Sequence, residues 1–332
     1  MSAQRVVDMG DRIKWGYAYN QWKFSWQDFA RVDDNLRALK VTSACGFRAL
    51  ELCAGTGPWF PLGRPESIAI NFGSAAKFKM TLQDCGIDAI SSTFYDPTMM
   101  SFEELHHGLM PTRQQDHAVI LSTARIHAEF LAQVGGSCLV VRPFPSFAAE
   151  GALDRERLQA AADCWNSVGA MTKALGLHTV LHLDALSALR TTAQLDEVLK
   201  LTDPASVNLA LDTAELTIAG HKVVELYRRY HTRVRHFHFK DAVAVDTLGE
   251  YALPNAERAM ILAGGKRRIR RWFSEMGTPE GLVDFPALLR AMKECGYGGW
   301  IIVESDKGPQ PAASGMMLNS WYLQRILKPL LD

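Results

Sequence analysis

Short apolar runs alternate with longer amphipathic stretches along the whole chain. Eight of these runs have the length of buried β-strands and are rich in β-branched and aromatic residues. They are Ile13–Tyr19, Arg48–Cys53, Asp88–Phe94, Cys138–Phe144, Thr179–Asp184, Val207–Thr213, Val234–Lys240 and Trp300–Glu304. The pattern therefore predicts eight strands spread over nearly the full length of the sequence.

Helical spacing fills the intervals between several of these runs. One such stretch ends at Gly176, and another runs from Phe285 to Cys295 and ends at Gly296. Glycine is the residue that most often ends a helix, because it adopts a left-handed conformation without strain. The apolar positions of the first stretch are Leu158, Ala162, Trp165, Val168, Met171 and Leu175.

Eight strands with intervening helices favour parallel pairing, because each crossover must return along the sheet. We expect an α/β fold, a single (β/α)₈ TIM barrel over residues 1–332, which leaves no edge strand. The alternative is an open doubly wound sheet. That fold favours a Gly-rich phosphate loop after the first strand, and the segment Tyr17–Trp22 contains none.

The regular rhythm breaks after the seventh predicted strand, over residues 243–283. This insertion carries a basic run that is followed by Trp272. The run fits either a solvated helix face or a lid or partner-docking segment over the barrel mouth. A second long loop, Ala54–Glu66, carries Trp59 among glycines and prolines, and long loops after strands are often functional. The basic residues are Lys266, Arg267, Arg268, Arg270 and Arg271.

Polar side chains gather at the carboxyl ends of the predicted strands, where (β/α)₈ barrels hold their catalytic groups. Side chains alternate between the two faces of a strand, so His182 shares a face with Asp184, and His236 and His238 share one with Lys240. Converging buried ionisable groups are costly unless an opposite charge compensates them. The polar set is Glu51, Arg142, His182, Asp184, Asp212, His238, Lys240, Asp241, Glu304 and Asp306.

Four of these groups lie at matching depth on four adjacent strands, and a divalent cation bound between them would offset the cost of burying them together. The nitrogen and oxygen donors of His182, Asp212, His238 and Glu304 suit Mn²⁺ first, and also Co²⁺, Zn²⁺, Fe²⁺ or Mg²⁺. Taken singly, each residue has a plainer interpretation. A strand-end histidine is commonly a hydrogen-bonded core residue, and an aspartate after a strand is commonly the N-cap of the next helix.

Composition narrows the class of protein. Lys plus Arg (36) balances Asp plus Glu (36), which argues against a nucleic-acid partner, because phosphate contacts require a basic surplus. The 6 cysteines form no Cys-x-x-Cys pair and are expected to be free thiols. The N-terminus lacks a signal-peptide pattern, and no apolar stretch has the length of a membrane span. We expect a soluble, cytoplasmic protein without a membrane partner.

Three segments carry a resemblance to a known family. LALDTAELTIAG (Leu209 to Gly220) resembles the Asp-Thr-x-His strand end of the sugar-phosphate isomerase/epimerase superfamily, the xylose isomerase-like barrels. VRHFHFKDA (Val234 to Ala242) is similar to its His-x-Lys-Asp strand, and GTPEGLVDFPALLRAMKECGYGGWIIVESD to its closing turn, helix and Val-Glu strand. The resemblance covers most of the chain and is strongest from Thr179 to Asp306.

The resemblance implies one divalent metal held by Glu, Asp, His and Glu on the fifth to eighth strands. Asp212, His238 and Glu304 match the last three ligands. At the first position this chain has His182, with Asp184 as an alternative two residues on. Glu215 stands where many members carry a substrate-contacting histidine. In such enzymes the two glutamate ligands act as an acid/base pair, and only Glu304 of that pair is present.

The family chemistry implies proton removal beside a metal-polarised carbonyl, giving an enediolate. Reprotonation would make the protein an isomerase or epimerase. Expulsion of a leaving group would make it a lyase, as in the C-glycoside deglycosidase large subunits, which act on 3-oxo-glucosides beside a small β-rich partner. Candidate catalytic residues are Glu304, Lys240, Asp241 and Glu215, and candidate substrate contacts are Glu51, Trp59, Tyr95, Arg142 and Asp184, with Trp15 as a further aromatic face.

Two other classes fit less well. An apurinic-site endonuclease with a related barrel would require further ligands and a basic groove. A non-catalytic barrel that serves as a binding subunit would purify without stoichiometric metal. We therefore expect a small-molecule sugar or glycoside substrate, and a protein that forms oligomers.

Overall fold

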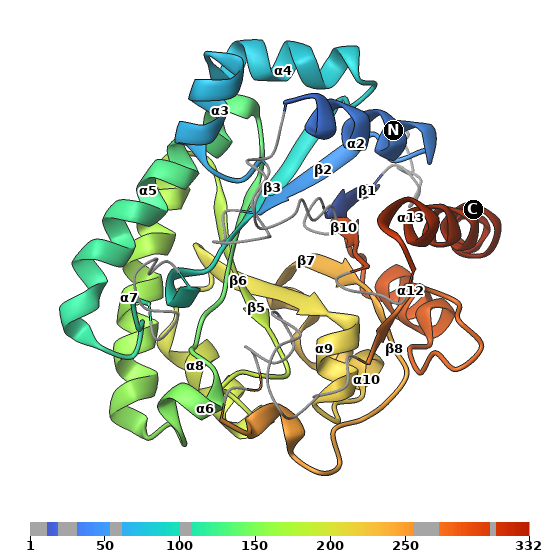
Figure 1. The fold of residues 1–332 in the computed structure, drawn as a ribbon. Coiled ribbons are helices and arrows are strands. Elements are labelled where there is room, and N and C mark those ends of the chain that lie inside the picture. Colours follow the sequence, from blue (N-terminus) through green and yellow to red (C-terminus); the bar gives the residue numbers. More distant parts are fainter. Residues whose placement is uncertain are drawn as a thin grey trace, which may run out of the picture.

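A closed barrel of eight parallel strands forms the centre of the molecule in the computed structural model (Figure 1). The structure describes residues 12–18, 32–53, 62–99, 108–254, 256, 272–305 and 310–331. The barrel strands, in spatial order, are β1 (Ile13–Ala18), β10 (Gly299–Val303), β7 (Val234–Phe239), β6 (Val207–Asp212), β5 (His178–Leu183), β4 (Cys138–Val141), β3 (Ala89–Tyr95) and β2 (Ala49–Cys53).

The closed sheet confirms the predicted barrel and excludes the open doubly wound alternative, since β1 pairs with both β10 and β2. All eight predicted strands are present, with bounds that differ by one to three residues. The largest difference is in the fourth strand, which ends at Val141 and not at Phe144. Pro143 lacks a backbone N–H, which removes a donor from the hydrogen-bond ladder at this point.

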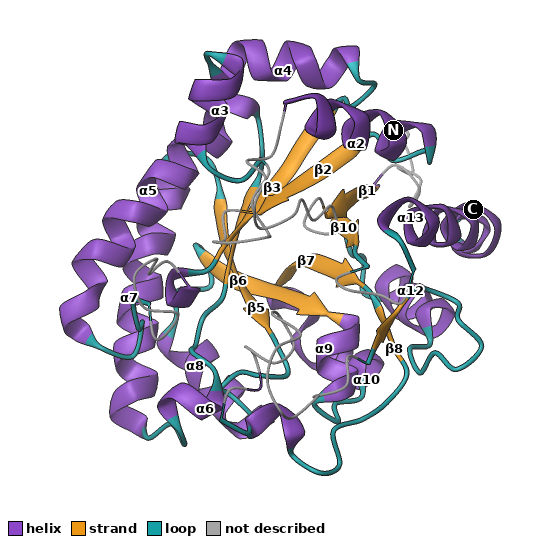
Figure 2. Cartoon of the chain, viewed as in Figure 1, coloured by secondary structure: helices purple, strands orange, loops and turns teal. Residues whose placement is uncertain are grey.

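Helices surround the barrel on its outer side, as Figure 2 shows in purple around the orange strands. The long helix α7 begins where the Asp154 side chain accepts a hydrogen bond from Arg157 N. In the same way, α12 begins where the Asp284 side chain accepts a hydrogen bond from Ala287 N. The helices are α2 (Val32–Ala44), α3 (Pro65–Phe72), α4 (Ala75–Asp84), α5 (His117–Val134), α6 (Phe147–Glu150), α7 (Arg155–Ala174), α8 (Thr192–Leu201), α9 (Thr213–Ile218), α10 (Val223–Tyr230), α12 (Phe285–Glu294) and α13 (Ala312–Tyr322).

The polarity of the barrel interior changes along the strands. Cys138, Val140, Val180 and Ala210 form a small apolar cluster between β4, β5 and β6, with Phe94 packed against it. The next inward positions on β5 and β6 are His182 and Asp212, and β2, β7 and β10 contribute further buried ionisable side chains. On β5 and β6 the interior is therefore apolar in the middle of the strands and polar at their carboxyl ends.

The predicted insertion begins at a short antiparallel sheet. Strand β8 (Asp241–Ala242) pairs with β9 (Phe273–Ser274), so the two ends of the segment lie together next to β7. The basic run Lys266 to Arg271 lies outside the described residues. In the described part of the chain, no helix combines the length and hydropathy needed to cross a membrane.

Candidate metal centre

Four side chains that the sequence predicts as metal ligands converge at the carboxyl ends of β5, β6, β7 and β10. His182 Nε2 lies 3.4 Å from Asp212 Oδ2. His238 Nδ1 lies 3.7 Å from the same oxygen and 3.2 Å from Glu304 Oε2. All four side chains are buried, and His182 is the most exposed of them at 5%. They therefore form one compact donor cluster in the barrel interior.

The spacing of three of these donors fits a single divalent cation, and the fourth residue, Glu304, adjoins them with its Oε2 3.2 Å from His238 Nδ1. Bonds of about 2.1 Å from a metal to its nitrogen and oxygen ligands hold neighbouring donor atoms roughly 3 to 3.5 Å apart. The donor atoms of His182, Asp212 and His238 all lie within 4.8 Å of one another. In addition, Nδ1 of His238, the nitrogen that faces Asp212 and Glu304, is buried without a hydrogen-bond partner among the described residues. A buried orphan nitrogen is rare unless a ligand completes it.

The two oxygens of Asp212 have different tasks. Oδ1 accepts hydrogen bonds from Ala214 N and Glu215 N, each at 2.9 Å, and so caps the first turn of α9. This is the plainer role that an aspartate after a strand often has. It leaves Oδ2 directed toward His182 and Lys240. The cap fixes the carboxylate orientation that a metal ligand requires.

A lysine supplies positive charge within this cluster. Lys240 Nζ lies 3.1 Å from Asp212 Oδ2 and 3.2 Å from Glu304 Oε2. Burial by itself would raise the pKa of both carboxyl groups, but Lys240 and the histidines hold the pKa of Asp212 well below its usual value and that of Glu304 at about 2. Both carboxylates are therefore ionised and available as ligands at neutral pH.

His238 shows how strongly the site favours positive charge. Burial would lower its pKa, yet Glu51, Glu304 and Asp212 around the ring raise it well above the usual value. These carboxylates thus favour a proton on this imidazole. A divalent cation would take the place of that proton, because metal ligation requires the neutral ring.

Glu215 lies beside the cluster in a different charge state. Its Oε1 is 3.8 Å from Lys240 Nζ, and its Oε2 accepts a hydrogen bond from Ala185 N at 2.9 Å. Burial raises the pKa of Glu215 to about 8, and Asp212 and Asp184 add to the rise, although Lys240 opposes it. Two carboxyl groups on one helix turn are therefore held in opposite protonation states, which is the arrangement that acid/base chemistry needs.

Comparisons with known proteins show the family of this chain. The xylose isomerase-like TIM barrel family matches residues 39–321. The chain belongs to this family. Among curated proteins, it is similar to an inosose dehydratase of Lacticaseibacillus casei, with 29% identity over 197 residues, which cover 56% of this chain and 63% of that protein. The match thus spans somewhat under two thirds of the relative's length.

Solved structures repeat the fold of this xylose isomerase-like barrel. The probable 3-DHS dehydratase AsbF from Bacillus anthracis superposes with a TM-score of 0.68 at 12% identity, covering 94% of this chain and 99% of that one. The 3-keto-D-glucoside 4-epimerase YcjR from E. coli gives a TM-score of 0.62 at 14% identity, with coverage of 94% and 99%. At such low identity these matches show a shared fold.

In this xylose isomerase-like barrel, Arg142 and Asp184 bind each other at the barrel rim. Arg142 Nε lies 3.1 Å from Asp184 Oδ2, and its Nη1 lies 3.3 Å from Asp96 Oδ2. Of the two alternatives for the first ligand, His182 approaches Asp212, whereas Asp184 is engaged by Arg142. The Arg142 guanidinium is thus held on two sides by carboxylates, and its contact with a substrate stays a prediction.

Glu51 lies in the barrel interior as the sequence predicts, but it is occupied by protein partners. Its Oε1 is 2.8 Å from His238 Nε2, and its Oε2 accepts from His236 Nε2 at 2.8 Å and from Ser92 Oγ at 2.7 Å. The predicted contact of Glu51 with a substrate hydroxyl stays a prediction. Glu51 supports a predicted metal ligand.

Two further predicted site residues face away from the cluster. Tyr95 is completely buried, and its hydroxyl lies 2.6 Å from Thr123 Oγ1 on α5, so it cannot offer a face to a sugar ring. Asp241 accepts hydrogen bonds from Ala242 N and Val283 N and anchors the β8 region. Strand alternation explains both errors, since each directly adjoins an inward-facing residue.

Trp15 also belongs to the outer layer, where it contacts Phe239 edge-on. Trp59 and Asp306 lie outside the described residues.

The structure adds an aromatic cover that sequence reasoning missed. The Phe273 ring lies over Lys240, with Nζ 4.2 Å from the ring centroid. Phe273 belongs to a second apolar cluster, which also contains Tyr251 and Ala214, with Trp272 packed against it. Tyr251 and Trp272 stack with ring centroids 5.0 Å apart. No local signal marks Phe273, because its role depends on β9 folding back beside β8.

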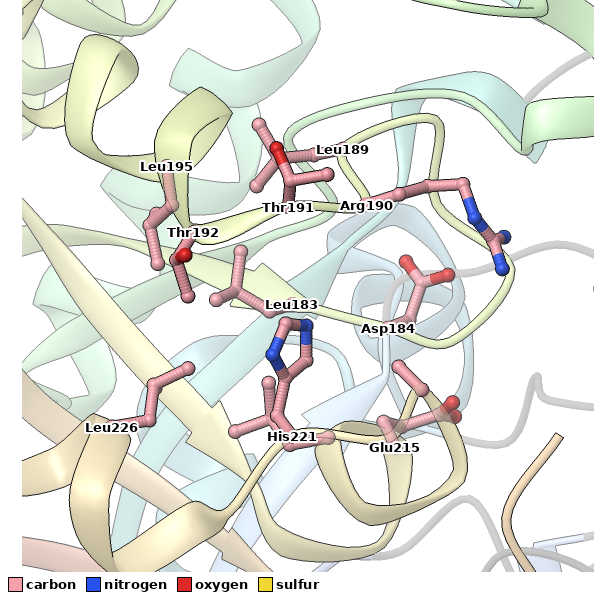
Figure 3. A pocket seen from close by; sticks show the side chains of 12 residues that line it. Leu183, Asp184, Leu189, Arg190, Thr191, Thr192, Leu195, Glu215, His221 and Leu226 are labelled. Carbon is pink, nitrogen blue, oxygen red and sulfur yellow. The ribbon is translucent and has the colours of Figure 1, made fainter. Parts of the chain in front are cut away.

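A small cavity adjoins the outer side of the site, between the loop after β5 and helix α9 (Figure 3). Its ionisable lining residues are Asp184, Arg190, Glu215 and His221. Its volume of about 20 Å³ is enough for one water molecule. The cavity places a water-sized space next to the Glu215 side chain.

Proposed function

We propose that this protein is a divalent-metal-dependent enzyme that removes the proton beside the carbonyl of a keto-sugar or keto-polyol and forms an enediolate. The observation that carries the proposal is the convergence of His182, Asp212, His238 and Glu304 at one end of a closed barrel, with Lys240 and Glu215 beside them. Membership of the xylose isomerase-like family supports it.

Each residue has a distinct role in this scheme. A bound divalent ion, with Mn²⁺ as the first candidate, would polarise the carbonyl and acidify the neighbouring C–H. Glu304, ionised and at the end of β10, would accept that proton. Lys240, 3.2 Å from Glu304 Oε2, would stabilise the negative charge that develops on the substrate oxygen. Phe273 over the lysine would exclude water from this side.

The fate of the enediolate depends on the second acid/base group. Epimerisation at one carbon requires such groups on both faces of the substrate, and the strand that would supply the second carboxylate carries His182. Glu215 is buried, and its pKa of about 8 keeps it largely protonated at neutral pH. A carboxylic acid in this position would donate its proton to a departing hydroxyl or aglycone. We therefore favour elimination, a dehydratase or lyase reaction.

The relatives support both outcomes. The similar curated proteins are named inosose dehydratases, which favours loss of water from a keto-polyol. The second candidate, isomerisation or epimerisation, draws on structural neighbours such as the 3-keto-D-glucoside 4-epimerase. Elimination of an aglycone from a 3-oxo-glycoside is the same kind of reaction as loss of water, with a larger leaving group.

The charges at the rim favour an uncharged substrate. Arg142 contacts Asp96 and Asp184, and Lys240 contacts Asp212 and Glu304. In the portion of the chain that the structure describes, both buried cations at this rim are thus compensated by carboxylates. A substrate phosphate or carboxylate would have to displace one of these partners, whereas a hydroxyl accepts hydrogen bonds from an already compensated cation.

The test is incubation of the manganese-loaded enzyme in D₂O with an inosose, a 3-keto-glucoside and a free ketose, followed by NMR and mass spectrometry. Loss of water or aglycone supports elimination. Deuterium uptake with retention of all substituents supports isomerisation or epimerisation instead. The Asp212→Ala variant serves as the control for background exchange. If the metal-bound enzyme gives no deuterium uptake and no product with any of these substrates, enediolate chemistry is contradicted.

A further inference from the structure

A second buried polar group lies directly beneath the candidate metal centre and shares His238 with it. Glu51 on β2 contacts both His236 and His238 on β7, each at 2.8 Å between a carboxylate oxygen and a ring Nε2. Ser92 on β3 donates its hydroxyl hydrogen to Glu51 Oε2 at 2.7 Å. Glu51 is only 3% exposed, and His236 is completely buried. These groups therefore interact without competition from bulk water.

The position of Glu51 decides which nitrogen of His238 can bind a metal. Nε2 faces the carboxylate of Glu51, while Nδ1 faces Asp212 and Glu304 at 3.7 and 3.2 Å. Glu51 is the closest of these carboxylates, and Asp212 and Glu304 are themselves proposed ligands of the same ion. With the ring proton on Nε2 toward Glu51, the lone pair on Nδ1 is available to the ion. Carboxylates that hold metal-binding histidines in this way fix both the tautomer and the ring orientation.

The same three residues admit a competing interpretation, because the donor atoms of Glu51, His236 and His238 also lie within 4.8 Å of one another. They could hold a second cation of their own. However, Oε2 of Glu51 already accepts two hydrogen bonds, from His236 and Ser92. A cation at this level would require the loss of the ring protons that face Glu51, and His238 would then have to bridge two metals.

We propose that Glu51 is a positioning residue that presents Nδ1 of His238 to a single metal ion, and that the Glu51–His236–Ser92 group binds no ion itself. This inference rests on the metal-dependent function proposed above. Neither ring nitrogen of His238 makes a hydrogen bond of good geometry to a described residue. The short contact to Glu51 is therefore bent, and metal binding at Nδ1 is expected to align it.

The test measures metal binding rather than turnover. Wild-type protein, Glu51→Gln and Ser92→Ala are titrated with Co²⁺ against a chelator, and bound metal is counted by mass spectrometry. Glu51→Gln retains the size of the side chain but replaces one acceptor with an NH₂ donor, so one histidine loses its partner. We expect weakening of Co²⁺ affinity by about 10- to 100-fold and an altered visible spectrum. Ser92→Ala, the matched control, should change affinity less than about threefold, because His238 retains its contact with Glu51.

A measurement on the wild-type protein guards against a variant that fails to fold. In ¹⁵N-histidine NMR of the zinc-loaded chain, His238 should show a protonated Nε2 and a metal-bound Nδ1. Coordination through Nε2, or unchanged Co²⁺ affinity and spectrum in folded Glu51→Gln, would overturn the positioning role alone. Two ions per wild-type chain would show that the Glu51 group is a metal site. No ion in the wild-type chain would instead contradict the proposed function.

Discussion

Asp212 offers a way to separate the structural and the metal-binding contributions of one carboxylate. Its Oδ1 caps α9 through two backbone N–H groups, and its Oδ2 faces His182 and Lys240. Asp212→Ala removes both functions. Asp212→Asn keeps an oxygen for the cap but removes the negative charge. Comparison of the two variants therefore divides the effect between the two oxygens.

The expected magnitudes follow from these contacts. Replacement of an N-cap by alanine costs about 0.5 to 2 kcal/mol. Here the backbone N–H groups of two buried residues, Ala214 and Glu215, would be left unsatisfied, so we expect about 2 kcal/mol between Asp212→Asn and Asp212→Ala in the free energy of unfolding. Both variants lose the charge opposite Lys240. Each should therefore bind Mn²⁺ more weakly by more than the roughly 100-fold that accompanies loss of a supporting hydrogen bond.

The assay combines urea denaturation of the metal-free proteins with Mn²⁺ titration of each folded variant. Far-UV circular dichroism before titration confirms that both variants are folded. Wild-type Mn²⁺ affinity in Asp212→Asn would refute the assignment of Oδ2 as a ligand. Equal stability of the two variants would refute the argument that Oδ1 holds the start of α9.

Three further predictions concern neighbouring residues. The pKa of Glu215 rises from 4.5 to about 8 on folding, so the folded chain keeps a proton that the unfolded chain releases, and stability should fall as pH rises between these values. In urea titrations of the metal-free proteins, the free energy of unfolding of Glu215→Gln should therefore increase relative to that of wild type as the pH rises from 5 to 9. Parallel pH profiles of the two proteins would contradict the raised pKa of Glu215. Glu304→Gln should lower kcat far more than Mn²⁺ affinity, whereas equal losses would leave Glu304 as a ligand only. Tyr95→Phe should cost about 1 kcal/mol of stability through the lost bond to Thr123 and leave kcat unchanged; a large fall in kcat would restore Tyr95 to the site.

The strands and the converging histidines could be predicted because they depend on local periodicity. A buried parallel strand is an apolar run, and residues at its carboxyl end reach the same rim as those of its neighbours. This is why His182, Asp212, His238 and Glu304 could be grouped before any contact was known. Glu51 was also found as an inward residue, because the same alternation applies to β2.

The roles of the neighbouring residues were decided only by the tertiary structure. Whether Glu51 contacts a substrate or a histidine depends on the pairing across the barrel, which brings β2 and β7 to opposite sides of one narrow interior. The same holds for the cover of Lys240 by Phe273, which lies 33 positions further along the chain. Sequence patterns report which face a side chain occupies, since that has a fixed period. They do not report its partner, because the distance between two faces is set by the closure of the whole sheet.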